Sequence, residues 1–157
     1  RMRKKDLGLI SMTYGNIYIA SVSLANPGHT VKAFLEAESY DGPSLILAYS
    51  HCIAHGIRMD AGVDNCKKAV DCGHWPLYRF DPRRTAKGEN PLQLDSKPPS
   101  IPFEEFANGE NRFRVLKKTH PEEAEALMKQ ANAEVRAHFD LYRKLAGMEA
   151  DCGKKDS

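Results

Sequence analysis

Cys52 is the residue of this sequence with the clearest potential for chemistry. It follows the apolar run 44–49, and His51 and His55 lie on either side of it. Open α/β sheets bind ligands at the carboxyl ends of their strands, so a thiol in this place is a candidate metal or cluster ligand. The alternative is a small buried side chain, because unpaired cysteine is among the most buried residue types.

The other three cysteines do not complete a site with Cys52. The intervals from Cys52 to Cys66 and Cys72 match neither the close C-x-x-C pair of zinc sites nor the cysteine runs of ferredoxins. Cys66 falls on the apolar face of a predicted helix and is expected to pack in the core, while Cys72 and Cys152 are expected to be incidental. Without an export signal, we expect all four to be reduced.

The histidines beside Cys52 allow a second hypothesis, in which an imidazole activates the thiolate as a nucleophile. His51 and His55 share one loop with the cysteine, which is not a catalytic geometry, and the sequence identifies no third orienting group. His51 is instead expected to donate a hydrogen bond to whatever Cys52 binds.

A charged run beside prolines is another candidate site. Asp81, Arg83 and Arg84 could bind an anionic group, although such a run is more typical of a solvated turn. No glycine-rich phosphate loop is present in the sequence.

The elements that position Cys52 indicate an α/β fold. Residues 17–24 are almost all β-branched, small or apolar, which predicts a strand covered on both faces. Asn26 and Pro27 then predict the start of a helix. A turn at 41–43 precedes a second apolar strand over 44–49, so we expect a β-α-β unit with adjacent parallel strands.

Further elements follow Cys52. A short helix is predicted over 60–72, and a third strand-like segment over 75–80, where Pro76 favours a strand end or a sheet edge. Residues 81–102 hold more than half of the nine prolines. They are expected to form an extended arm that makes few contacts with its own core.

The clearest helix comes last in the sequence. Thr119 and Glu122 fit a capping box, and apolar residues then recur every three or four positions as far as Tyr142.

Composition limits the class of protein. The 157 residues suit one domain, with 41% hydrophobic and 28% charged residues, as in ordinary globular proteins. The net charge of +2 comes from 23 basic and 21 acidic residues that are mixed along the chain, so nucleic acid is not an expected partner. No apolar run is long enough for a membrane span and no secretory signal is present, so a cytoplasmic location is expected.

Several runs of the sequence resemble the pyruvate:ferredoxin (flavodoxin) oxidoreductases. These runs are KDLG at 5–8 with MTYG at 12–15, GPS at 42–44 leading into AYSHCIAHG at 48–56, WPLYRFDPR at 75–83 and GENPLQLDSK at 88–97. They occur in order over about residues 5–147, which makes the resemblance specific.

The resemblance implies a thiamine diphosphate enzyme that decarboxylates pyruvate and forms acetyl-CoA. Electrons would pass singly through 4Fe–4S clusters to ferredoxin or flavodoxin. Cys52 corresponds to the family's fourth ligand of the cluster nearest the thiamine. The family's G-D-G…N segment for Mg²⁺ and diphosphate lies upstream of this region, as do the other three cluster cysteines, and neither occurs here. Together with Arg1 in place of a start methionine, this predicts a truncated chain that is inactive alone.

The resemblance also implies a domain organisation. Residues 1–80 would be the C-terminal part of the thiamine diphosphate-binding domain, a partial α/β fold with parallel strands and flanking helices. Residues 81–157 would be a C-terminal extension, the proline-rich arm plus the last helix, that packs across a homodimer. The expected partners are the remaining domains, a second copy, ferredoxin or flavodoxin, pyruvate and coenzyme A. The alternative is a stand-alone redox or scaffold module that derives from such an enzyme and keeps only its fold.

Overall fold

The structure of the chain is a computed structural model that describes residues 5–148, apart from the side chain of His55. Cys152 and Arg1, on which two of the expectations rest, lie outside the described residues. In the described range, no helix combines the length and the apolar character that a membrane crossing requires.

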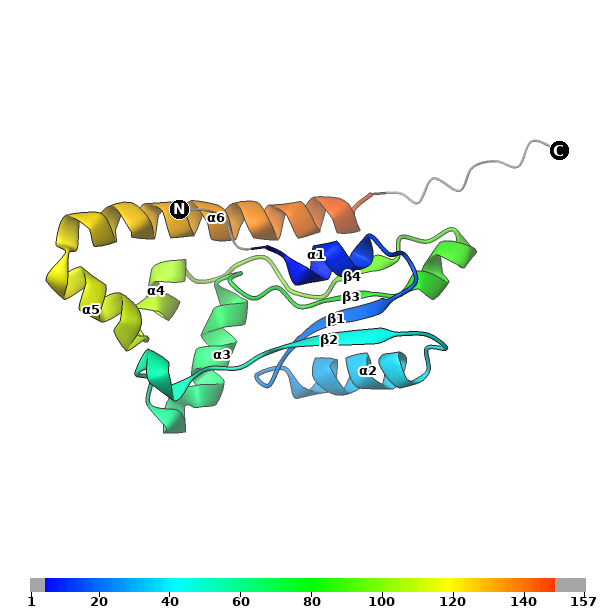
Figure 1. The fold of residues 1–157 in the computed structure, drawn as a ribbon, viewed down its shortest axis with the longest axis horizontal. Helices are drawn as coiled ribbons and strands as arrows, with labels where there is room; N and C mark the ends of the chain where they lie inside the picture. The colour runs from blue at the N-terminus through cyan, green and yellow to red at the C-terminus, as the bar shows by residue number, and fades with distance from the viewer. Residues whose placement is uncertain (1–4, 149–157) are drawn as a thin grey trace.

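One mixed sheet of four strands forms the centre of the fold (Figure 1). The strands lie in the order β2-β1-β3-β4, and their bounds are β1 Tyr18–Ser23, β2 Ser44–Tyr49, β3 Tyr78–Phe80 and β4 Leu92–Leu94. β1 and β2 run parallel, with Tyr18 opposite Ser44 and Ser23 opposite Tyr49. The predicted α/β class and the adjacent parallel strands are therefore confirmed.

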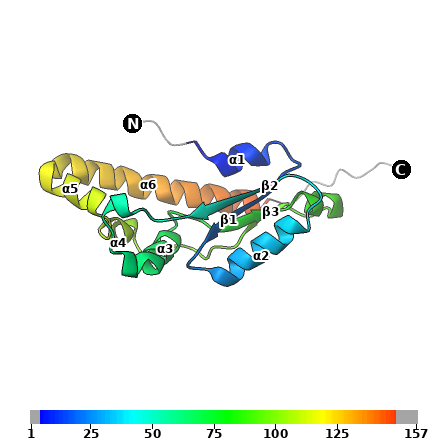
Figure 2. The same cartoon turned by 60° about the horizontal axis from the view of Figure 1, so that its bottom comes forward.

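Helices cover both faces of the sheet, as Figures 1 and 2 show. Helix α2 (Pro27–Glu38) connects the parallel strands and lies on one face, while α1 (Leu7–Met12) and the long α6 (Pro121–Ala146) lie on the other. All six residues of β1 are buried as a result. Tyr18, Ala20 and Val22 pack with α2, and Ile19 packs with Tyr142 of α6.

Short helices gather at the end of the sheet where β2 leads out (Figures 1 and 2). They are the 3₁₀ turns η1 (Ile53–His55) and η2 (Met59–Ala61), then α3 (Gly62–Asp71), α4 (Phe103–Ala107) and α5 (Asn111–Thr119). An apolar cluster that includes Cys72, Phe103 and Phe106 joins α3 to α4. This end of the molecule positions the loop that carries Cys52.

The expectation that residues 81–102 make few contacts with the core is wrong. The segment forms a 3₁₀ helix, η3 (Pro82–Lys87), and the strand β4, which pairs antiparallel with β3. β3 itself lies between β1 and β4, so of the two places that Pro76 favoured, the strand end is confirmed and the sheet edge is wrong. Pro76 is tolerated because it precedes the first paired residue, Tyr78, and removes no ladder hydrogen bond.

The last helix is confirmed, but its predicted capping box is wrong. Thr119 is the final residue of α5, and its hydroxyl donates to the carbonyl of Val115 at 3.1 Å. α6 instead begins at Pro121, after His120. Proline suits this first position because its missing N–H would have no partner within the helix.

Candidate functional site

The loop between β2 and α3 presents Cys52 to solvent. β2 ends at Tyr49, and Cys52 follows with extended backbone angles (φ −127°, ψ 135°) directly before η1. Gly56 ends η1 in the left-handed region at φ 69°. The side chain of Cys52 is exposed. The thiol therefore lies where the sequence predicts it, beyond the carboxyl end of a parallel strand, and the alternative of a buried core cysteine is wrong.

The neighbouring thiols are buried and point elsewhere. Cys66 is 0% exposed, and its Sγ lies 3.5 Å from Nδ1 of His51. Cys72 is 2% exposed, and its Sγ donates to the carbonyl oxygen of Ala69 at 3.5 Å. Burial raises the pKa of both thiols, that of Cys72 to about 11. Both stay protonated near neutral pH, whereas metals bind the thiolate. The prediction that Cys66 packs in the core is confirmed.

His51 lies against α3 rather than along the exposed loop. Besides its contact with Cys66, its ring covers Gly62, where a Cβ atom would lie 2.5 Å from His51 Cε1. The structure therefore pairs the imidazole with Cys66. The role of His51 toward a group bound at Cys52 stays a prediction.

The donor set around Cys52 fits one corner of a shared cluster. Among the side chains of residues 5–148 that the structure describes, which leaves out that of His55, no group of three or more His, Cys, Asp or Glu is placed to hold a metal ion. A mononuclear zinc site made by these residues alone does not fit this arrangement. A single exposed thiol on an extended backbone does fit a four-cysteine iron–sulfur cluster whose other ligands come from outside the described residues.

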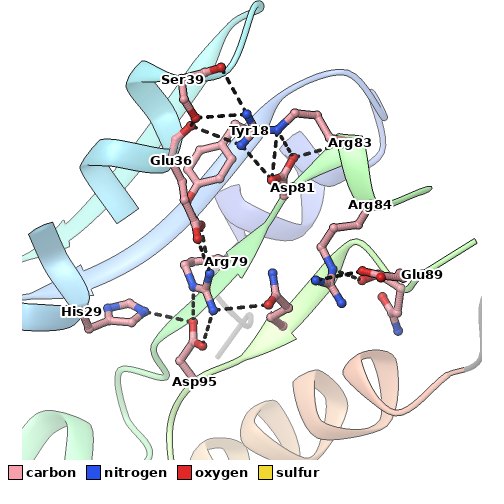
Figure 3. Close-up of polar contacts among 12 residues, drawn as sticks. Tyr18, His29, Glu36, Ser39, Arg79, Asp81, Arg83, Arg84, Glu89 and Asp95 are labelled. Atoms are coloured by element: carbon pink, nitrogen blue, oxygen red, sulfur yellow. Dashed lines mark hydrogen bonds and ion pairs between the residues drawn. The ribbon is translucent and has the colours of Figure 1, made fainter. Parts of the chain in front are cut away.

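The charged run at 81–84 has its partners within the chain (Figure 3). Arg83 Nη2 lies 2.8 Å from Asp81 Oδ2, and Arg83 Nη1 also donates to the Ser39 carbonyl. Arg84 donates to the Asn90 carbonyl at 2.8 Å. Burial alone would raise the pKa of Asp81, but hydrogen bonds from Arg83 hold it below its ordinary value. These contacts favour the structural turn over the anion-binding site.

A buried ion-pair network is the main feature that sequence reasoning missed (Figure 3). Arg79 of β3 is 5% exposed and lies 2.7 Å from Glu36 of α2 and 2.8 Å from Asp95. His29 Nε2 lies 3.0 Å from Asp95 Oδ2. Burial acts to raise the pKa of Asp95, but hydrogen bonds from His29 and Arg79 lower it to about 2. A lone arginine in an otherwise apolar strand was the signal in the sequence that could have indicated this network. A buried charge requires partners, so such an arginine predicts acidic residues around it.

A groove of about 1110 Å³ lies apart from the thiol. Its walls come from α1, α4, α5, α6 and the sheet, with Trp75, Phe103 and Met128 among them, and they do not include Cys52. The groove and the candidate ligand are therefore separate features of the fold.

Comparison with known proteins finds close relatives that are named as enzymes of pyruvate oxidation. The chain is 54% identical over 151 residues to pyruvate-flavodoxin oxidoreductase of Trichormus variabilis, and 50% identical over 145 residues to pyruvate:ferredoxin oxidoreductase of Moorella thermoacetica. It is 47% identical over 147 residues to mitochondrial pyruvate dehydrogenase (NADP⁺) of Euglena gracilis. The three matches cover 96%, 92% and 92% of this chain.

The share of each relative is much smaller. The chain spans 13% of the Trichormus protein, 12% of the Moorella protein and 8% of the Euglena protein. No family model matches the chain. Identity at this level over almost the whole chain shows common descent, and the chain therefore belongs to the family of pyruvate-flavodoxin and pyruvate:ferredoxin oxidoreductases, of whose members it spans about an eighth.

Proposed function

We propose that this chain is part of a longer pyruvate oxidoreductase, and that Cys52 is its one ligand to a 4Fe–4S cluster. The observation that carries the proposal is the placement of the thiol. Cys52 is exposed beyond the parallel pair β1–β2, whereas Cys66 and Cys72 are buried. A solvent-facing thiolate is available to a cluster whose other three cysteines belong to the rest of the protein.

The reaction of the whole enzyme is the oxidative decarboxylation of pyruvate. Pyruvate and coenzyme A give acetyl-CoA, CO₂, one proton and two electrons, and the electrons leave one at a time. Thiamine diphosphate with Mg²⁺ would supply the carbanion chemistry, and the clusters would supply one-electron transfer. No residue of this chain is proposed to act on pyruvate itself.

The contribution of this chain would be to hold one thiolate in place. β2 carries the loop to the carboxyl end of the sheet, and Gly56 turns the backbone after η1. The contact of His51 with Cys66 keeps that second thiol occupied inside α3. Among the three cysteines that the structure describes, Cys52 would then be the sulfur offered for ligation.

The electron acceptor would be selected outside this segment. The relatives are named for flavodoxin, ferredoxin and NADP⁺, although each is about half identical to this chain. A segment so similar across three acceptors is better suited to a shared step than to acceptor choice. We propose ferredoxin or flavodoxin as the electron carrier. We propose the cytoplasm as the location of the enzyme.

The domain organisation is proposed on the same basis. Residues 1–80 would complete the thiamine diphosphate-binding domain, and residues 81–157 would form a C-terminal extension that packs across a homodimer. The exposed apolar side chains of α2, which are Val31, Phe34 and Leu35, are compatible with burial against other parts of the enzyme.

The test is Cys52→Ser in the full-length enzyme. Serine offers a harder and more weakly binding donor than thiolate, so we expect the cluster nearest the thiamine to be lost or its spectrum altered. Iron analysis and electron paramagnetic resonance of the reduced protein measure this. Decarboxylation of bound pyruvate should still begin.

Cys66→Ser and Cys72→Ser are the matched controls. Both thiols are buried, so these variants are expected to lower stability and to leave the iron content unchanged. An unaltered cluster spectrum and full iron content in Cys52→Ser would refute the ligand assignment.

A further inference from the structure

The loop that carries Cys52 rests on the junction between α4 and α5. We name residues 50–56 the Cys52 loop and residues 108–112 the α4–α5 junction. A Cβ atom on Gly56 would lie 2.3 Å from Cβ and 3.2 Å from Nδ2 of Asn111. Real Cβ atoms do not approach so closely, so the Gly56 backbone and the Asn111 side chain are in direct contact. Asn111 thus occupies the space that any side chain at Gly56 would need.

The α4–α5 junction is itself firmly held. Glu110 is 0% exposed, and its carboxylate accepts a hydrogen bond from Arg112 Nε. The Glu110 carbonyl accepts from the amide of Phe113 at 3.2 Å and so starts α5. On the other side, a Cβ on Gly109 would lie 3.2 Å from the carbonyl oxygen of Phe106. Asn111, an exposed residue, therefore begins α5 directly after a buried and hydrogen-bonded residue.

The same junction lies near the strand that leads into the loop. Tyr49 is the last residue of β2, and its pKa lies above the ordinary value. Burial is the larger cause, and the negative charge of Glu110 adds to it. Tyr49 also packs on Trp75, with ring centroids 5.4 Å apart.

The Cys52 loop is consequently held from two sides. Before Cys52, the ring of His51 lies against Gly62 and Cys66 of α3. After Cys52, Gly56 lies against Asn111 of α5. Residues 52–55, between these two contacts, include the exposed thiol. Two fixed ends restrict the directions in which that thiol can point.

We propose that Asn111 is a positioning residue for Cys52, acting through its contact with Gly56. The inference rests on the proposed function, because it assigns Asn111 a role only if Cys52 is a ligand. It means that a residue in the C-terminal part of the chain sets the geometry of a ligand in the N-terminal part. Preorganised ligands bind metals more tightly than ligands that must be ordered on binding.

A double-mutant cycle in the full-length enzyme tests the contact. Gly56→Ala introduces the Cβ atom that meets Asn111, and Asn111→Gly removes the atoms it meets. Hydrogen exchange of the amides at 50–57 reports the order of the loop, and iron per chain reports the cluster. We expect Gly56→Ala to raise the exchange rate of these amides about tenfold or more and to lower the iron content by about four atoms per chain. Adding Asn111→Gly should restore much of the exchange protection and much of the iron content.

Gly15→Ala is the matched control. Gly15 has nearly the same left-handed backbone, with φ 73°, but a Cβ there would meet nothing within 4 Å. It carries the same conformational cost for alanine without the steric contact. The exchange of residues 12–18 around Gly15 then shows what backbone strain alone does to a loop, and we expect it to rise by clearly less than tenfold while the iron content stays unchanged. A rise at residues 12–18 as large as the rise at residues 50–57 in Gly56→Ala would mean that backbone strain alone is responsible, and would overturn the proposal.

Asn111→Gly alone keeps the test decisive if Gly56→Ala does not fold. It should raise exchange at 50–57 severalfold, because one of the two contacts is removed. Unchanged exchange and iron in this variant would overturn the proposal, even where Cys52→Ser loses its cluster. If instead Cys52→Ser keeps its iron while Asn111→Gly still loosens the loop, the contact stands and the ligand assignment fails.

Discussion

Arg79 Nη2 lies 2.8 Å from Asp95 Oδ1, in a partly buried network between the sheet and α2. The pair joins the internal strand β3 to the segment that follows β4. Arg79 also binds Glu36 of α2 at 2.7 Å, so one guanidinium connects three elements (Figure 3). The stability of the region around β4 should therefore depend in part on this one side chain, together with the backbone pairing of β3 with β4.

Arg79→Met is expected to destabilise the chain by about 3–5 kcal/mol, because it leaves the carboxylates of Glu36 and Asp95 without their main partner in a partly buried site. Urea unfolding measures the loss. Arg143→Met is the control, since Arg143 pairs with Asp140 at 2.9 Å but their side chains are 62% and 49% exposed. It should cost less than about 1 kcal/mol. Equal losses in the two variants would contradict a special role for the buried network.

Asp95 should make the fold sensitive to acid. Its pKa falls from 3.8 to about 2 on folding, so its charged form is favoured in the folded state. A lowered carboxylate pKa contributes stability that is present above pH 3.8 and is lost as the pH falls toward 2. The loss is about 2 kcal/mol across that window. The free energy of unfolding at pH 6 and at pH 2 measures this loss in the wild type and in Asp95→Asn. The difference in free energy between the two pH values should be smaller in Asp95→Asn by that amount. An unchanged difference would show that other carboxylates dominate.

Asp6→Ala should loosen the contact between α1 and α6. The Asp6 carboxylate caps α1 by accepting from the Leu9 amide at 3.0 Å, and it accepts from His138 at 2.7 Å and from Tyr142 at 3.0 Å. The loss of a helix cap and of a charged hydrogen bond predicts about 2–3 kcal/mol. Urea unfolding and hydrogen exchange of α1 measure it.

Asp6→Asn is the conservative partner of that variant. Its side-chain oxygen can still cap α1, so it should cost only about half as much. If Asp6→Ala changes neither stability nor the exchange of α1, the carboxylate is not the link between the two helices.

The elements that could be predicted are those that a local pattern specifies. β1, α2 and β2 follow from apolar runs separated by Asn26, Pro27 and a turn, and Pro27 does start its helix. β4 could not be predicted, because its three residues are a strand only through pairing with β3. α1 and α4 have six and five residues, too few to show a helical period.

The site could be predicted in part for the same reason. Cys52 follows a strong strand signal, so its place beyond the sheet was available from the sequence. Its supports were not, because His51 reaches Cys66 on another element and Gly56 meets Asn111 across a long separation in the chain. A glycine four residues after the cysteine was the only local hint that the backbone approaches something closely.

The pairing of Asp6 with His138 has a consequence for how the chain folds during synthesis. The two residues are 132 positions apart. At roughly 5–20 residues per second, the ribosome needs on the order of 10 s to make the second partner after the first. Throughout that interval, α1 lacks the helix that covers the same face of the sheet. Native closure of this face must wait for the last helix to emerge, so nascent chains arrested before α6 should be recognised by chaperones that bind exposed apolar surface.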